Sequence, residues 1–133
     1  MANPNIVNVT SIYGNTAYIT PSVITAVATW THNGTTALTG LTPASGTVNR
    51  VTSIVVANVT SSAANCTVQI SNNPTFASGT AYSIAYQISV PPNASLIVTD
   101  KTTSFYVTEN QSVGVTSGTA SALVYTATFE AIT

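Results

Sequence analysis

Short segments rich in Val, Ile and Thr, separated by Pro, Gly and Asn, recur through the last two thirds of the chain. Branched Cβ atoms stiffen these side chains and suit a pleated sheet, so such segments favour strands over helices. Apolar side chains do not recur at helical spacing over any stretch long enough for a helix. We expect strands at residues 48–60, 66–71, 81–90, 95–99, 104–107, 112–116 and 122–131. Their short, even spacing predicts an all-β fold, an antiparallel two-sheet sandwich with either a jelly-roll or an immunoglobulin-like topology.

The alternation of apolar and polar side chains is clearest in residues 81–90. A period of two is typical of a strand with one buried face. We therefore expect one set of side chains in this segment to face the core: Tyr82, Ile84, Tyr86, Ile88 and Val90. The same alternation directs Cys66, Val68 and Ile70 inward, where a buried thiol behaves as a small apolar group.

The first 45 residues are less regular, because Pro and Gly interrupt each apolar run. We expect strands at 5–13 and 15–20, joined by a turn at residues 14–15, and an apolar β-branched segment at 23–31. A hairpin turn is expected at 32–35, where Asn-Gly supplies the positive φ angles that tight turns require.

The expected organisation is an N-terminal arm or irregular β region at residues 1–45 and a β-sandwich core at 46–133, within one domain. Residues 1–20 either form an extended arm or hairpin that reaches a neighbouring subunit, or pair with the sheet of their own domain. Apolar and aromatic side chains in the N-terminal region are the candidate interface residues, because such side chains concentrate in protein interfaces. They are Ile6, Val7, Val9, Ile12, Tyr13, Tyr18, Ile19 and Trp30.

Charged side chains make up only 4% of the 133 residues, and the net charge is -1. An average soluble domain has about 25%. The 2 basic residues cannot neutralise the phosphates of a nucleic acid, and no apolar run approaches the ~20 residues of a membrane helix. So few charges give weak protection against self-association. We therefore expect other protein to cover much of the surface; the alternative is a neutral Thr/Ser/Asn surface that tolerates crowding.

The side chains that usually carry catalysis or bind metals are scarce. His32 is the only histidine and falls in the expected hairpin turn, and Cys66, the only cysteine, belongs to the expected core. Asp100 is expected in a solvated turn, Glu109 at a loop tip, and Glu130 on the outward face of the last strand. Their spacings are not those of acid–base pairs, nucleophile elbows or calcium loops. We expect no enzymatic activity, no catalytic residue, no cofactor and no metal site.

The strand and turn sequences resemble those of small virion structural proteins of tailed phages that infect cyanobacteria. The similar segments are residues 5–14 (NIVNVTSIYG), 51–59 (VTSIVVANV), 88–91 (ISVP), 95–98 (SLIV), 100–101 (DK) and 105–109 (FYVTE). The resemblance covers most of the chain except an insertion-like stretch around residues 28–45. The resembling proteins are richer in acidic residues near Glu109 and at the C-terminus.

The resemblance implies a virion component that has no active site and forms a homo-oligomer, since symmetric clustering is the common outcome for such units. We prefer a capsid decoration or cement protein that contacts the major capsid protein or other virion proteins and stabilises the head. A neck, tail or fibre component is the first alternative, and a carbohydrate- or host-surface-binding module is the second. The expected location is the virion, after assembly in the host cytoplasm.

Overall fold

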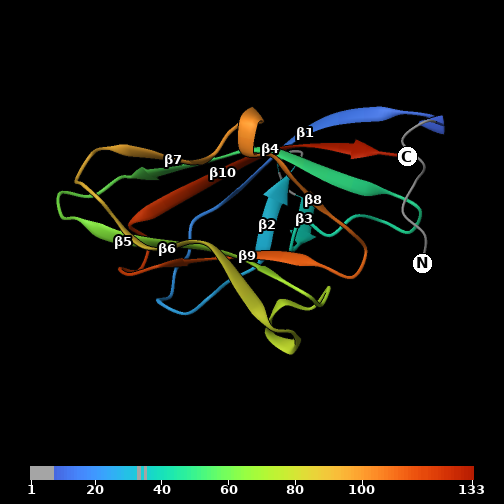
Figure 1. Ribbon diagram of the computed structural model, residues 1–133. Helices are drawn as coiled ribbons and strands as arrows, with labels where there is room; N and C mark the ends of the chain where they lie inside the picture. The colour runs from blue at the N-terminus through green and yellow to red at the C-terminus, as the bar shows by residue number, and fades with distance from the viewer. Residues whose placement is uncertain (1–7, 33, 35) are drawn as a thin grey trace.

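The computed structural model describes residues 8–32, 34 and 36–133, which form two antiparallel β-sheets packed face to face (Figure 1). The larger sheet contains β1 (Ile12–Ile19), β2 (Thr29–His32), β3 (Thr36–Thr39), β4 (Val48–Asn58), β7 (Ser95–Thr99), β8 (Phe105–Val107) and β10 (Leu123–Ile132). The smaller sheet contains β5 (Ala64–Ser71), β6 (Ala81–Val90) and β9 (Ser112–Ser117). Short 3₁₀ turns lie at Phe76–Ser78 and Lys101–Thr103. The predicted all-β two-sheet sandwich is confirmed.

The larger sheet is built around the last strand of the chain. Its strand order is β3-β2-β1-β10-β4-β7, and β8 also pairs with β4. The long strand β4 lies opposite β8 in its first half, at Asn49–Val51, and opposite β7 in its second half, at Ile54–Ala57. β10 therefore has a hydrogen-bonded neighbour on each side, β1 and β4.

The first described strand belongs to this sheet. β1 pairs with β10 along its whole length, from Ile12 opposite Ile132 to Ile19 opposite Tyr125. The expected turn at residues 14–15 is wrong, because β1 runs unbroken through Gly14, which lies opposite Glu130. Residues 12–19 therefore pair with the sheet of their own domain, which is the second of the two arrangements expected for residues 1–20. Residues 1–7, which include the first three residues of the expected strand at 5–13, lie outside the described residues.

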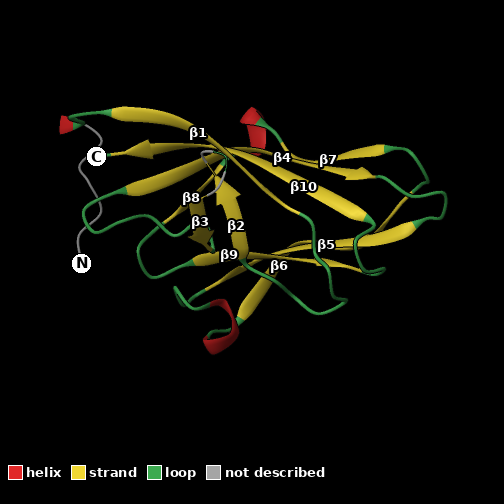
Figure 2. Ribbon diagram, turned by 180° about the vertical axis from the view of Figure 1, so that it is seen from behind, coloured by secondary structure: helices red, strands yellow, loops and turns green. Residues whose placement is uncertain are grey.

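The segment before β4 closes one side of the sandwich. The β2–β3 hairpin is confirmed, with Trp30 opposite Leu38, and Figure 2 shows these two strands of the larger sheet lying between its other strands and β9. Val27 exchanges two backbone hydrogen bonds with Val115 of β9, at 2.9 and 2.8 Å. The indole Nε1 of Trp30 donates to the carbonyl oxygen of Val113 at 3.0 Å. The β9 edge of the smaller sheet is therefore covered.

Gly40 makes this closure possible. The amide of Val113 donates to the carbonyl oxygen of Gly40 at 2.7 Å. Gly40 has φ +63°, and a Cβ atom at this position would lie 2.3 Å from the Cβ of Ser112. Only glycine adopts this conformation and permits this close approach without strain.

The core lies between the two sheets and consists almost entirely of aliphatic and aromatic side chains. Trp30 and Tyr125 are its largest members, both with 0% of their surface exposed. The other large side chains that are fully buried are Leu41, Ile54, Leu123, Val51, Val56, Val68, Val90, Val107, Val113 and Val115. Cys66 is fully buried beside Val68, as predicted, and Ile70 is half-buried against the same cluster.

Strand β6 has the predicted bounds but not the predicted orientation. Only Ala85 and Val90 are buried, whereas Tyr82 and Tyr86 are 58% and 63% exposed. The prediction that Tyr82, Ile84, Tyr86 and Ile88 fill the core is therefore wrong. The pairing of β5 with β6 shifts register twice, between Cys66 and Val68 and between Val68 and Gln69, and each shift inserts one extra residue into β6 and reverses its faces beyond that point. Between the two shifts Ala85 therefore faces inward in place of Ile84 and Tyr86. Tyr82 and Ile88 lie opposite the inward-facing Ile70 and Cys66, but they remain exposed on β6, the edge strand of the smaller sheet.

Candidate contact surfaces

The outward face of the larger sheet carries a row of uncharged side chains that crosses four strands. Tyr18 of β1 lies opposite Thr126 of β10, which lies opposite Val55 of β4, which lies opposite Ile97 of β7. Ile97 is 66% exposed, Tyr18 is exposed, and the two between them are half-buried. The next row is polar and neutral: Thr16, Thr128 and Ser53. We call these two rows the neutral face.

The charges on the same side of the sheet pair with each other. Arg50 Nη1 lies 3.7 Å from Glu130 Oε2, and both side chains are more than a third exposed. Arg50 also donates to the hydroxyl of Ser104 and lies opposite Tyr106. The predicted outward orientation of Glu130 is confirmed, since it is partly exposed while Phe129 is buried. An exposed ion pair contributes only about 0–1 kcal/mol to stability, but it leaves this surface without net charge.

Four of the residues that were predicted as contacts are exposed or half-buried in the structure. Ile12, Tyr13 and Tyr18 are exposed along β1, and Val9 is half-buried. The Tyr18 hydroxyl donates to the carbonyl oxygen of Gly34 at 2.9 Å, which ties this side chain to the segment between β2 and β3. These side chains are available to a partner.

Two of the predicted contact residues are corrected, and two are not described. Ile19 and Trp30 are buried within this chain, so neither presents a surface to another protein. Both face inward because β1 and β2 are strands of the larger sheet and not an arm. Ile6 and Val7 lie outside the described residues.

Several exposed apolar residues that sequence reasoning missed lie on the edge strands. Ile97 of β7 and Tyr106 of β8 are exposed, as are four side chains of β6. Their alternating pattern was visible in the sequence, but alternation marks one face of a strand without saying whether that face is covered. The position of a strand within its sheet supplies the missing information.

His32 lies beside a shallow cavity of about 240 Å³ and is not a surface turn residue as predicted. It is the last residue of β2, half-buried, and its ring stacks on Phe129 with 6.4 Å between centroids. Nδ1 is buried and has no hydrogen-bond partner among the described residues. The polar side chains around the cavity are neutral, including Asn15 and Asn49. Among the described residues that line the cavity, His32 has the only titratable side chain.

Glu109 lies in the turn between β8 and β9, as predicted, but its side chain is buried. Its side chain is 8% exposed, and Oε1 accepts a hydrogen bond from the amide of Gly46 at 2.6 Å. Oε2 is buried and makes no hydrogen bond within the described part of the chain. The carboxylate thus fastens the loop before β4 to the loop between β8 and β9.

The remaining titratable groups have structural surroundings. Asp100 caps the 3₁₀ turn Lys101–Thr103, and hydrogen bonds from the hydroxyl and the amide of Thr102 lower the pKa of its carboxyl group. This confirms its place in an exposed turn. Burial raises the pKa of the Cys66 thiol. Burial also raises the pKa of Tyr125, whose hydroxyl donates to the carbonyl oxygen of Thr116 at 2.6 Å.

Residues 8–32, 34 and 36–133 contain no group of three or more His, Cys, Asp or Glu side chains that could hold a metal ion. None of the helical turns in the same residues has the length and apolarity needed to cross a bilayer. The chain matches no protein-family model, no curated protein and no solved structure. Its architecture places it among the two-sheet β-sandwiches. Its exposed surfaces are the part of the molecule from which a function can be inferred.

Proposed function

We propose that this chain is a structural module that acts by packing against other protein, and that it has no enzymatic role. The observation that carries the proposal is the neutral face. A row from Tyr18 to Ile97 crosses four strands without a charge, and the nearby Arg50 and Glu130 neutralise each other. A broad, uncharged and partly apolar surface on a rigid sheet is suited to a protein interface, because little desolvation of charge opposes burial.

We further propose that the assembly is a phage particle and that the chain is a capsid decoration or cement protein. The support is the resemblance of its strand sequences to virion proteins of phages that infect cyanobacteria, together with its small size and depleted charge. The neutral face would lie on the major capsid protein. The protein would then be located in the virion after assembly in the host cytoplasm.

Mass spectrometry of purified phage particles tests this placement. Hundreds of copies per particle are expected for a decoration protein, whereas about a dozen would instead indicate a neck or tail component. Absence from the particles would refute the virion proposal.

A variant of the neutral face tests which surface is used. Ile97→Lys places a charge at the β7 end of the proposed contact, where the wild-type side chain is the most exposed apolar group of the row, so occupancy on heads reconstituted with the purified variant is expected to fall at least tenfold. Ile24→Lys is the matched control, because Ile24 is 64% exposed and lies outside both sheets. Equal occupancy of the two variants would show that the neutral face is not the contact.

The carbohydrate-binding alternative is less well supported. Five tyrosines are exposed among the described residues, but they are distributed over β1, β6 and β8 and do not converge on the cavity beside His32. A glycan array with the purified chain tests this alternative directly. Specific binding to a bacterial polysaccharide would favour it over the packing module.

A further inference from the structure

We propose that β6 is the pairing edge of a two-fold homodimer. In this dimer, β6 of one copy runs antiparallel to β6 of a second copy about Ala85, and the two smaller sheets join into one. The inference concerns a different surface from the neutral face and does not depend on the chain belonging to a virion.

The first observation is that β6 is an open edge. It pairs with β5 and with no other strand of the described residues, whereas the opposite edge, β9, is covered by Val27 and Trp30. Natural edge strands are usually protected by charged side chains or proline. The ten residues of β6 contain neither.

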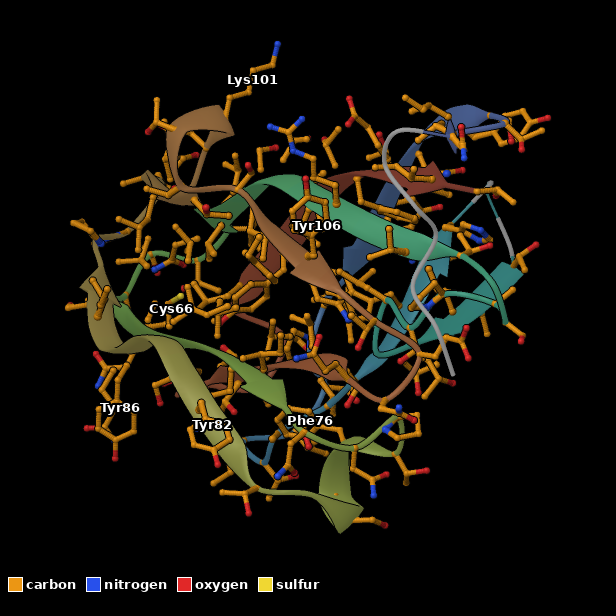
Figure 3. All side chains as sticks on the ribbon, turned by 45° about the vertical axis from the view of Figure 1, so that its right-hand side comes forward. Cys66, Phe76, Tyr82, Tyr86, Lys101 and Tyr106 are labelled. Atoms are coloured by element: carbon orange, nitrogen blue, oxygen red, sulfur yellow. The ribbon has the colours of Figure 1, made fainter. Side chains whose placement is uncertain are left out.

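The second observation is that β6 is exposed and apolar. Tyr82, Ile84, Tyr86 and Ile88 are all exposed, and Figure 3 shows the rings of Tyr82 and Tyr86 at the outside of the molecule. At on the order of 200 Å² for a fully exposed aromatic side chain, these four expose roughly 400 Å² in each copy. Two copies therefore contribute at most roughly 800 Å² towards the about 1,200–2,000 Å² of a standard interface, to which strand pairing adds the backbone.

The third observation is that the strand is self-complementary about Ala85. The residues opposite the inward-facing side chains of β5 are Tyr82, Ala85 and Ile88, which are evenly spaced because of the two register shifts. A two-fold axis at Ala85 places Tyr82 opposite Ile88 of the second copy, and Ile84 opposite Tyr86. Each aromatic side chain therefore meets a β-branched one, which is a favourable cross-strand pair.

The same symmetry keeps the two faces of the sheet consistent. Ser83 would lie opposite Gln87 of the second copy, so the polar side chains also meet each other. The amide of Gln87, whose φ is +49°, donates to the hydroxyl of Thr67 at 3.0 Å. The backbone amide at this irregular position therefore already has a hydrogen-bond partner within its own sheet.

A second copy fits this edge better than a charged partner. β6 has no charge with which to recognise an acidic or basic protein, and two neutral strands do not repel each other. An isologous interface requires one patch that complements itself. The arrangement about Ala85 meets that requirement.

Sedimentation velocity of the purified chain over a range of concentrations tests the dimer. The wild type is expected to dimerise. The double variant Ile84→Lys/Tyr86→Lys puts like charges opposite each other, and its dissociation constant is expected to rise at least tenfold. The double variant Ile84→Lys/Tyr86→Glu changes the same two exposed positions but places opposite charges together, so its dissociation constant is expected to stay within a few-fold of the wild type.

Far-UV circular dichroism of each variant establishes that it is folded. Ile97→Lys, which changes the neutral face, is the control for the surface, and it is expected to dimerise like the wild type. A wild type that stays monomeric at about 1 mM would overturn the proposal and would mean that the register shifts protect the edge. A dimer that survives Ile84→Lys/Tyr86→Lys, or that Ile97→Lys disrupts, would place the contact elsewhere. Loss of the dimer in both double variants would refute the register about Ala85.

Discussion

β10 and β6 are both ten residues long, and both alternate apolar with polar or small side chains over much of their length. β10 lies at the centre of the larger sheet with partners on both sides, and its inward side chains Tyr125, Ala127 and Phe129 are buried. β6 has one partner and leaves most of its side chains exposed. The difference teaches that alternation defines the faces of a strand, whereas the number of neighbours and the register decide which face is covered.

Deleting residues 1–20 is expected to have the largest effect on stability, because the deletion removes β1 and makes β10 an edge strand like β6. Ala17 and Ile19 are buried, and β1 pairs with β10 over eight residues. The truncated chain is expected not to fold, as shown by loss of the β-sheet circular dichroism signal. A folded truncated chain with an exposed β10 would contradict the central role of β1.

Truncation of one aromatic side chain on each strand compares them directly. Phe129→Ala on β10 is expected to lower the free energy of unfolding by about 3–5 kcal/mol, because it opens a cavity in the core. Tyr86→Ala on β6 is expected to change it by at most about 0.5 kcal/mol in the monomer, since the ring is exposed. Urea denaturation at a protein concentration below the dimer dissociation constant measures both. Equal losses would mean that β6 is buried in the monomer.

The closed β9 edge provides a sharper contrast with the open β6 edge. Trp30→Phe keeps an aromatic ring but removes the indole donor from the carbonyl oxygen of Val113. We expect a loss of about 1–3 kcal/mol, because the carbonyl oxygen is left buried without this partner. Hydrogen exchange should become faster at the amide of Val115, which bonds to Val27 across the same edge. Unchanged exchange there would show that Trp30 does not hold the closure.

The smallest effect is expected at the exposed turn after β7. The pKa of Asp100 is lowered in the folded state, so its carboxylate contributes stability at neutral pH. That contribution is lost as the pH falls below about 4 and passes through the folded pKa. Thermal unfolding of the wild type should therefore lose slightly more stability over this range than Asp100→Asn, which cannot titrate. Parallel pH profiles for the two chains would show that the capping hydrogen bonds of Thr102 contribute nothing measurable.

The amino-acid sequence by itself determined the all-β class, the strands after residue 47 and the inward position of Cys66. These are local properties: β-branched side chains favour extended backbone, and Pro, Gly and Asn end strands wherever they fall. The outward position of Glu130 followed from the same alternation along β10.

Only the tertiary structure decided which surfaces remain open. The pairing of β1 with β10 buried Ile19, and the closure against β9 buried Trp30, although both had been expected at an interface. Two register shifts against β5 turned Ala85 inward in place of Tyr86, and the edge position of β6 left Tyr82 exposed, although both tyrosines are predicted in the core. Strand order and register depend on residues far apart in the chain, so no local pattern encodes them.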